Sequence, residues 1–194
     1  MAKKKSGKSW KAWADTHAKN STSIDDLEST FKANLKAFKK ALEDAGATIE
    51  VESTLRSKKR AYLFHWAWRI VHDKTCKPST PTAMSGVDID WDHGDDAKSK
   101  AAAKEMVKAF GLAEPPKSTV APSLTSNHIA GKAIDMNITW DKTKKLKVKK
   151  KDGKTVEVPW MSNPNLNTKL HEVGASYGVK KHTKDKPHWS HNGK

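Results

Sequence analysis

The segment from Ser126 to Asp135, Ser-Asn-His-Ile-Ala-Gly-Lys-Ala-Ile-Asp, places a histidine and an aspartate seven residues apart with a glycine between them. In a continuous strand, His128 and Asp135 would point to opposite faces. In a continuous helix they would share a face but lie roughly 10 Å apart along the axis. A turn between them can bring both side chains to one metal ion, and Gly131 is the residue that can supply it. We therefore expect a turn at Gly131, followed by a strand.

The residues after this turn alternate as a half-buried strand requires. Every second residue from Ile134 to Trp140 is apolar, and the intervening face carries Asp135. One face would therefore pack on a core, while the other directs a carboxylate away from it. We interpret the partner of that carboxylate as zinc.

Composition limits which metal sites and partners are available. The formal net charge of +15 predicts attraction to polyanions, such as nucleic acid, anionic membranes or anionic cell-wall polymers. Only Arg56, Arg60 and Arg69 are arginines, and a coat of lysines favours loose electrostatic attraction over base readout. Cys76 is the only cysteine, which excludes an intramolecular disulfide and a four-cysteine zinc site. Any metal must therefore be bound by histidine and carboxylate side chains.

Hydrophobic spacing predicts the remaining elements. Helices are expected over residues 23–46, 58–73, 96–110 and 165–177, a strand over 47–53, and a lysine-rich hairpin over 144–158. In the hairpin, Leu146 should face Val158, and Gly153 should take the left-handed position of a three-residue loop. Its lysines are interpreted as a solvated face. Residues 1–20 are rich in lysine and are expected to form a flexible basic tail, with a single domain over 21–194.

A second group of polar residues lies near the end of the chain, in Asp185-Lys-Pro-His-Trp189. Pro187 excludes a helix centre and favours extended geometry for the residue before it, so these residues belong to a strand or its approach. Catalytic zinc sites commonly use three protein ligands and keep a fourth position for water. His128, Asp135 and His188 make such a set. Asp185 is then a free carboxylate beside the site, as a general base requires.

The paired motifs Ser126-x-His-x-x-Gly-x-Ala-x-Asp135 and Asp185-x-Pro-His-Trp189 resemble those of the zinc D-Ala-D-Ala metallopeptidase family. That family includes D,D-carboxypeptidases, dipeptidases and phage endolysins that cut the L-alanyl-D-glutamate bond of peptidoglycan stems. The resemblance covers residues 24–191. It implies an α+β fold of the hedgehog/DD-peptidase type, a small antiparallel sheet with packed helices, in which the lysine-rich hairpin is an insertion.

The resemblance also assigns roles to residues. It implies that Zn²⁺ is the cofactor, held by His128, Asp135 and His188, and that Asp185 is the general base. The substrate-binding arginine of the family matches Arg56, which would stabilise the developing oxyanion or pair with a substrate carboxylate. Ser126 and Trp189, which belong to the two motifs, are expected to bind substrate.

The implied function is a zinc-dependent hydrolase of peptidoglycan stem peptides, a monomer that lyses or remodels the cell wall. It would act in the periplasm or at the wall, with anionic wall polymers as electrostatic partners and no specific nucleic acid. No secretory signal peptide or transmembrane segment is apparent in the sequence. We therefore expect release by lysis with a holin, or by a specialised secretion system. Removal of the last ten residues should abolish activity, because it removes His188.

Three other interpretations remain open at this point. The metal ligands can be His182, His188 and His191, a cluster near the end of the chain. The chain can be a basic, non-enzymatic nucleic-acid-binding protein that uses its tail and hairpin as contacts. It can also be an inactive wall-binding module with a structural metal, although such a site does not need the fourth carboxylate, Asp185.

Overall fold

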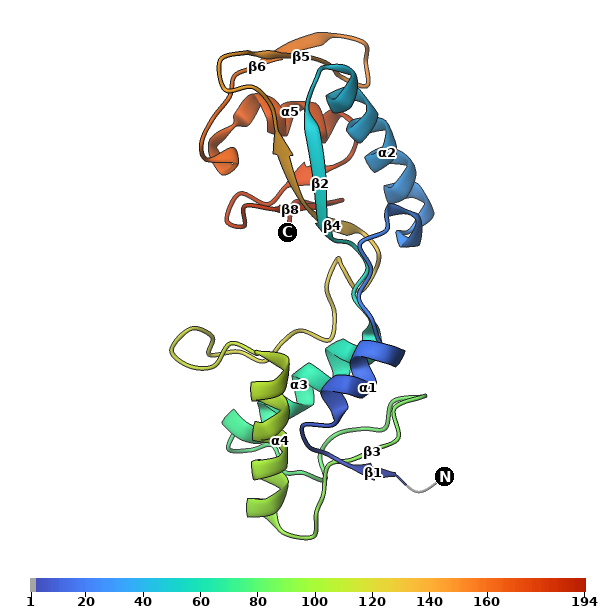
Figure 1. Ribbon diagram of the computed structural model, residues 1–194, viewed down its shortest axis with the longest axis vertical. Coiled ribbons are helices and arrows are strands. Elements are labelled where there is room, and N and C mark those ends of the chain that lie inside the picture. Colours follow the sequence, from blue (N-terminus) through green and yellow to red (C-terminus); the bar gives the residue numbers. More distant parts are fainter. Residues whose placement is uncertain (1–2) are drawn as a thin grey trace. The chain divides into compact units, whose positions relative to one another are not determined.

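The computed structural model describes residues 3–194, and the chain divides into two compact units (Figure 1). Unit 1 consists of Met1–Lys19 and Ser57–Leu124, and unit 2 consists of Asn20–Arg56 and Thr125–Lys194. The chain therefore leaves unit 2 after Arg56 and returns to it at Thr125. Both units combine helices with short strands, which gives the α+β class expected from the sequence.

Unit 1 is built on helices that pack around a core rich in aromatic residues. Its elements are β1 (Lys4–Lys5), α1 (Trp10–His17), α3 (Lys58–His72), β3 (Ile89–Asp90) and α4 (Asp96–Phe110), with β1 and β3 paired in parallel. Asp95 caps α4 by accepting a hydrogen bond from the main-chain N–H of Lys98 at 2.8 Å. Gly111 ends the helix in the left-handed conformation, as predicted. The predicted helices over 58–73 and 96–110 are confirmed.

The expectation of a flexible tail over residues 1–20 is wrong for residues 3–19, and residues 1 and 2 lie outside the described part of the chain. Trp10, Ala14 and Ala18 are spaced four apart and form one buried stripe against α3 and α4. Arg60 fixes the same segment, because its guanidinium pairs with Asp15 at 2.7 Å and donates to the carbonyl of Ala18 at 2.9 Å. The expected single domain over 21–194 is likewise replaced by the two units.

Unit 2 holds a four-stranded antiparallel sheet and two helices. The sheet has the order β2 (Thr48–Ser53), β4 (Ala133–Thr139), β8 (His188–Ser190) and β7 (Lys180–Lys181). The helices are α2 (Ser29–Asp44) and α5 (Thr168–Ser176), and a separate hairpin is formed by β5 (Leu146–Lys149) and β6 (Thr155–Val158). Short 3₁₀ turns, η1 (Ile24–Asp26) and η2 (Pro164–Leu166), precede the two helices.

The two helices of unit 2 begin later than predicted. Ser23 caps η1, and Glu28 caps α2 by accepting hydrogen bonds from the N–H groups of Thr30 and Phe31. Residues 164–166 form η2, so that α5 starts only after Asn167, whose side chain accepts from the N–H of Leu170 at 3.1 Å. In both places a 3₁₀ turn replaces the first turn of the expected helix.

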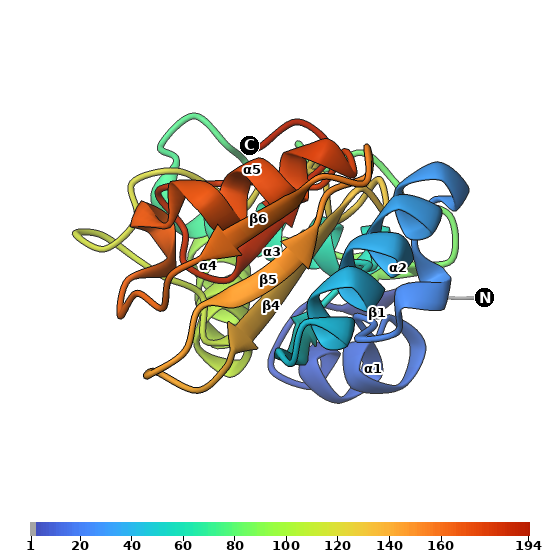
Figure 2. The same cartoon turned by 90° about the horizontal axis from the view of Figure 1, so that it is seen from above.

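The lysine-rich hairpin has the predicted register, with Leu146 opposite Val158, and Gly153 in its loop has a φ of +84°. It lies between α2, beside β5, and α5, beside β6 (Figure 2). Leu146, Val148 and Val158 are buried in the core of unit 2. The hairpin is thus part of the core on one face and solvated on the other. Within residues 3–194, no helix is both long and apolar enough to cross a membrane.

Gly174 in α5 permits a close approach that supports the last strand. A Cβ atom at this position would lie 2.6 Å from Cζ3 of Trp189 and 2.6 Å from the carbonyl oxygen of Val179. Gly174→Ala should therefore overpack the core of unit 2 and lower its free energy of unfolding by roughly 1–3 kcal/mol. Urea unfolding measures this loss. Ala175→Ser, at an exposed position of the same helix, is the control, and equal midpoints for the two variants would contradict the packing.

Candidate metal centre

Three side chains from separate parts of unit 2 converge on one point. Asp135 on β4 lies opposite His188 on β8 in the register of the sheet, and His128 comes from the turn that precedes β4. Nε2 of His128 lies 3.3 Å from Oδ1 of Asp135 and 3.1 Å from Nδ1 of His188. The His188 nitrogen is 3.0 Å from the same carboxylate oxygen. This is the group of possible metal ligands that residues 3–194 contain.

The turn at Gly131 makes this convergence possible, as predicted. Gly131 has a φ of +69°, and a Cβ atom there would lie 2.9 Å from the main-chain nitrogen of Glu28. The turn closes through a hydrogen bond from the N–H of Gly131 to the carbonyl of His128 at 3.2 Å. Its own carbonyl accepts from the N–H of Glu28 at 3.0 Å, which ties the turn to the start of α2. Only glycine satisfies both the conformation and the contact.

In each imidazole, the ring nitrogen that points away from the cluster, here called the outer nitrogen, indicates where the ring carries its hydrogen. Nδ1 of His128 lies 2.6 Å from the carbonyl oxygen of Thr54, and Nε2 of His188 lies 3.1 Å from that of Lys194. A carbonyl only accepts, so each of these nitrogens carries the hydrogen. The two inner nitrogens of the neutral rings then present lone pairs to each other and to a carboxylate oxygen. Three lone pairs at such distances repel one another unless a proton or a metal ion lies between them.

The spacing of these atoms fits a metal ion. Tetrahedral coordination with bonds of about 2.0–2.2 Å requires ligand atoms about 3.3–3.6 Å apart. The observed separations of 3.0, 3.1 and 3.3 Å are a few tenths of an ångström shorter. Carbonyl groups that fix the outer ring nitrogens are also the usual second layer of a metal site. His128, Asp135 and His188 can therefore hold a metal ion.

The charges of the cluster act on one another. Burial alone would lower the pKa of His128 and raise that of Asp135. The hydrogen bonds between the imidazoles and the carboxylate outweigh burial, so the pKa of His128 lies above its usual 6.5 and that of Asp135 well below its usual 3.8. Without a metal, the His128 imidazole therefore holds its proton to a higher pH than an unperturbed histidine does. The positive charge of Arg56 opposes this and lowers the pKa of His128.

A solvent-open hollow of about 550 Å³ gives access to the cluster. Its lining includes Ser126, His128, Asp185 and His188. Asp185 is exposed and lies outside the group of converging ligands. The structure thus brings the predicted general base, two ligands and one predicted substrate contact to a single hollow.

The other two predicted substrate residues lie elsewhere. The main-chain N–H of Arg56 donates to the carbonyl of His128 at 3.1 Å, so that this arginine sits directly behind a ligand. Trp189, by contrast, is only 1% exposed and packs against Phe38 with ring centres 5.4 Å apart. It is absent from the lining of the metal hollow, because strand alternation turns it to the opposite side from His188. Trp189 lines a separate hollow of unit 2 instead, and a role for it in substrate binding stays a prediction.

The alternative ligand set near the end of the chain does not assemble. His182 lines the hollow, and its ring stands 5.7 Å from that of His188. His191 is exposed, and its main-chain N–H donates to the carbonyl of Lys132. Among residues 3–194, these three histidines do not form a group of converging ligand atoms.

Lys181 is a functional residue that the sequence reading missed. It is only 7% exposed, and its ammonium donates to the carbonyls of His182 at 2.7 Å, His188 at 3.1 Å and Asp185. These carbonyls belong to the loop that carries both Asp185 and His188. Burial lowers the pKa of Lys181 to about 8 despite the nearby carboxylates. Lys181 lies two residues after the buried Val179, and residues two apart in an extended segment share a face. This spacing is the signal in the sequence that predicts an inward side chain for Lys181.

Searches of protein-family models and of curated protein sequences find no match to this chain.

The raised pKa of His128 predicts how stability depends on pH. In metal-free protein its stabilising effect is complete below pH 6.5 and is lost as pH rises through the pKa of the folded state. Thermal unfolding with a chelator should show a melting temperature that declines over this range. Excess zinc should reverse the trend, because the deprotonated imidazole binds the metal. His128→Ala is the control and should lack both effects; an identical pH profile in this variant would contradict the assignment.

Lys181→Met should loosen the loop that carries His188 without touching any ligand side chain. The substitution leaves up to three carbonyls without their charged donor, which costs roughly 1–3 kcal/mol for each buried group. Metal affinity should fall by about 10- to 100-fold, as for other outer-layer partners of a metal site. Calorimetric titration with zinc measures this. Lys180→Met, at the exposed neighbouring position, should bind zinc like the unmodified protein.

Proposed function

We propose that unit 2 is a zinc-dependent peptidase that hydrolyses peptide bonds in the stem peptides of peptidoglycan. The proposal includes a D,D-carboxypeptidase or L-alanyl-D-glutamate endopeptidase specificity and a fold of the hedgehog/DD-peptidase type. The observation that carries it is the convergence of three lone-pair donors, two of which line one open hollow together with a separate, exposed carboxylate. A purely structural metal site has no use for that fourth group.

Zinc suits the two imidazoles and one carboxylate of the cluster, and when bound it lowers the pKa of water and polarises a peptide carbonyl. The residues of the chain then have separate tasks. His128, Asp135 and His188 leave one side of the cluster open toward the hollow. Asp185 accepts a proton from water and returns it to the leaving amine. Exposure suits this role, because the carboxylate exchanges its proton readily with solvent.

Arg56 supplies positive charge behind the cluster. Its main-chain N–H is hydrogen-bonded to the carbonyl of His128, and its positive charge lowers the pKa of the His128 ring. A guanidinium there can stabilise an oxyanion or pair with a carboxylate of the stem peptide. The lysines of the hairpin add a broad attraction to anionic wall polymers, which salt weakens. These features support action at the cell wall.

Asp185→Asn tests the catalytic assignment directly. The amide cannot accept the proton, so turnover should fall by about 10²- to 10⁴-fold, while zinc affinity stays unchanged because Asp185 is not a ligand. Purified peptidoglycan is incubated with protein, with and without a chelator, and new ends are identified by mass spectrometry. A new glutamate amine would indicate the endopeptidase, and released D-alanine the carboxypeptidase.

The matched control is Asp152→Asn, which alters an exposed carboxylate at the tip of the hairpin. It should cleave like the unmodified protein. Absence of any chelator-sensitive product from the unmodified protein would overturn the proposed function. Loss of zinc from Asp185→Asn would instead show that Asp185 is a ligand.

A further inference from the structure

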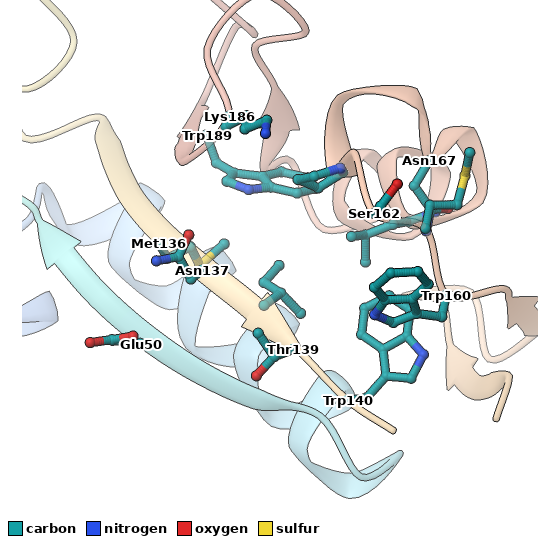
Figure 3. Close-up of a pocket in the computed structure, with 14 residues that line it drawn as sticks. Glu50, Met136, Asn137, Thr139, Trp140, Trp160, Ser162, Asn167, Lys186 and Trp189 are labelled. Atoms are coloured by element: carbon teal, nitrogen blue, oxygen red, sulfur yellow. The ribbon is translucent and has the colours of Figure 1, made fainter. Parts of the chain in front are cut away.

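A second hollow of about 340 Å³ lies in unit 2, away from the metal ligands (Figure 3). We propose that it binds a single neutral saccharide ring, an N-acetylhexosamine of the glycan strand that carries the stem peptide. The identity of the polymer rests on the proposed peptidase function, whereas saccharide binding does not. Pockets for small molecules span roughly 300–1,000 Å³. The volume of this hollow is near the lower end of that range, so it suits one sugar ring better than a longer segment of a polymer.

The hollow forms where the sheet stops. Strand β8 pairs with β4 only as far as Asp135 and His188, and the hydrogen bond from Met136 N–H to Pro187 O at 2.9 Å is the last on that side. Strand β4 continues to Thr139, and among the described strands none pairs with that edge beyond Met136. The segment after β6 faces this edge and forms the opposite wall, with Trp160, Ser162 and Asn167.

Three tryptophans line the hollow together with other apolar side chains; Trp189 is buried, and the other two are more accessible. Trp140 follows β4, Trp160 follows β6, and both are only partly buried. Neighbouring lysines hold their rings in place. Nε1 of Trp140 donates to the carbonyl of Lys144 at 3.2 Å, and Nζ of Lys142 lies 5.4 Å from the ring centre of Trp160. Fixed indole rings bind the C–H face of a sugar at little cost in conformational entropy.

The polar part of the lining is neutral overall. The side chains of Asn137 and Thr139 are exposed on β4, and Ser162 adds a hydroxyl from the opposite wall. The Asn137 amide donates one hydrogen bond to Glu52 at 2.6 Å and leaves its oxygen to a ligand. Glu50 and Lys186 contribute one charge of each sign. On a chain of net charge +15, a balanced hollow is a poor receptor for a carboxylate-rich peptide or a phosphodiester. Hydroxyls and an acetamido group match these amide, hydroxyl and carboxylate side chains.

The second hollow and the metal hollow are lined by neighbouring stretches of the chain. Lys186 lines the second hollow and Asp185 the first, and the metal ligand Asp135 directly precedes Met136, which lines the second. The two hollows have no lining residue in common, but residues adjacent in the chain, at the approach to β8, line one or the other. A substrate that spans both hollows would have its scissile bond near the metal and a neighbouring sugar on the tryptophans.

Calorimetric titration of the full chain with N,N′,N″-triacetylchitotriose, in the presence of a chelator, tests the site without catalysis. We expect binding that weakens at least tenfold in Trp160→Ala and in Asn137→Ala, which alters an exposed strand residue and should leave folding intact. Leu166→Ala is the matched control, since Leu166 is 63% exposed on the same segment but does not line the hollow. It should bind like the unmodified protein.

Three results would overturn the inference. The first is no binding of the saccharide, and the second is equal affinity in the unmodified protein and Asn137→Ala. The third is binding of a sugar-free stem peptide that competes with the saccharide, which would identify a peptide site. These measurements do not depend on hydrolysis, so a failure of the proposed peptidase function leaves them interpretable.

Steady-state kinetics with and without the sugar on the substrate test whether one substrate occupies both sites. For a stem peptide attached to its disaccharide, Trp160→Ala should raise KM about tenfold and leave kcat unchanged, because the sugar contact is the same in substrate and transition state. For the sugar-free peptide both constants should be unchanged. Equal effects on the two substrates would contradict the saccharide assignment while leaving the peptidase intact.

Discussion

Repulsion among three lone pairs is the constraint around which unit 2 is arranged. Two imidazole nitrogens and a carboxylate oxygen lie within 3.3 Å of one another, which is favourable only when a proton or a metal ion lies between them. The fold fixes each of them separately. The turn at Gly131 directs His128, the pairing of β4 with β8 sets Asp135 opposite His188, and carbonyl groups orient both rings. A loosely held cluster would relieve the repulsion by moving apart.

The cluster was predictable because its determinants are local. Strand alternation places Asp135 on the face away from the core, Gly131 permits the turn, and Pro187 excludes a helix before His188. What was missed depends on distant contacts. The start of α2 shifts to Glu28, whose N–H is bonded to Gly131, a residue about a hundred positions away. The segment around Trp10 resembles a solvated basic tail until α3 and α4 cover its short apolar stripe.

The division into two units could not be read from the sequence either. The chain crosses between them at residues 19–20, 56–57 and 124–125, and only the last crossing lies at a stretch rich in Pro, Ser and Thr, residues 115–126. The two ends of the inserted stretch are nevertheless joined inside unit 2. Thr54 accepts from the His128 ring and the N–H of Arg56 donates to the His128 carbonyl. These hydrogen bonds hold His128 against the residues that follow β2, so its position is fixed by contacts within unit 2.

Lys181 differs from the exposed lysines of the surface because it is buried and hydrogen-bonded. Lys147 and Lys149 are exposed on the hairpin, where a charge keeps its hydration and contributes little beyond attraction to polyanions. Lys181 has the same chemistry but is buried, and its ammonium has exchanged water for three carbonyls of one loop. A buried charge that has lost its hydration needs hydrogen-bond partners from the protein. The hydrogen bonds then hold those partners in position. The loop that carries Asp185 and His188 is held in this way, so a lysine that touches no ligand side chain helps to determine where the third ligand lies.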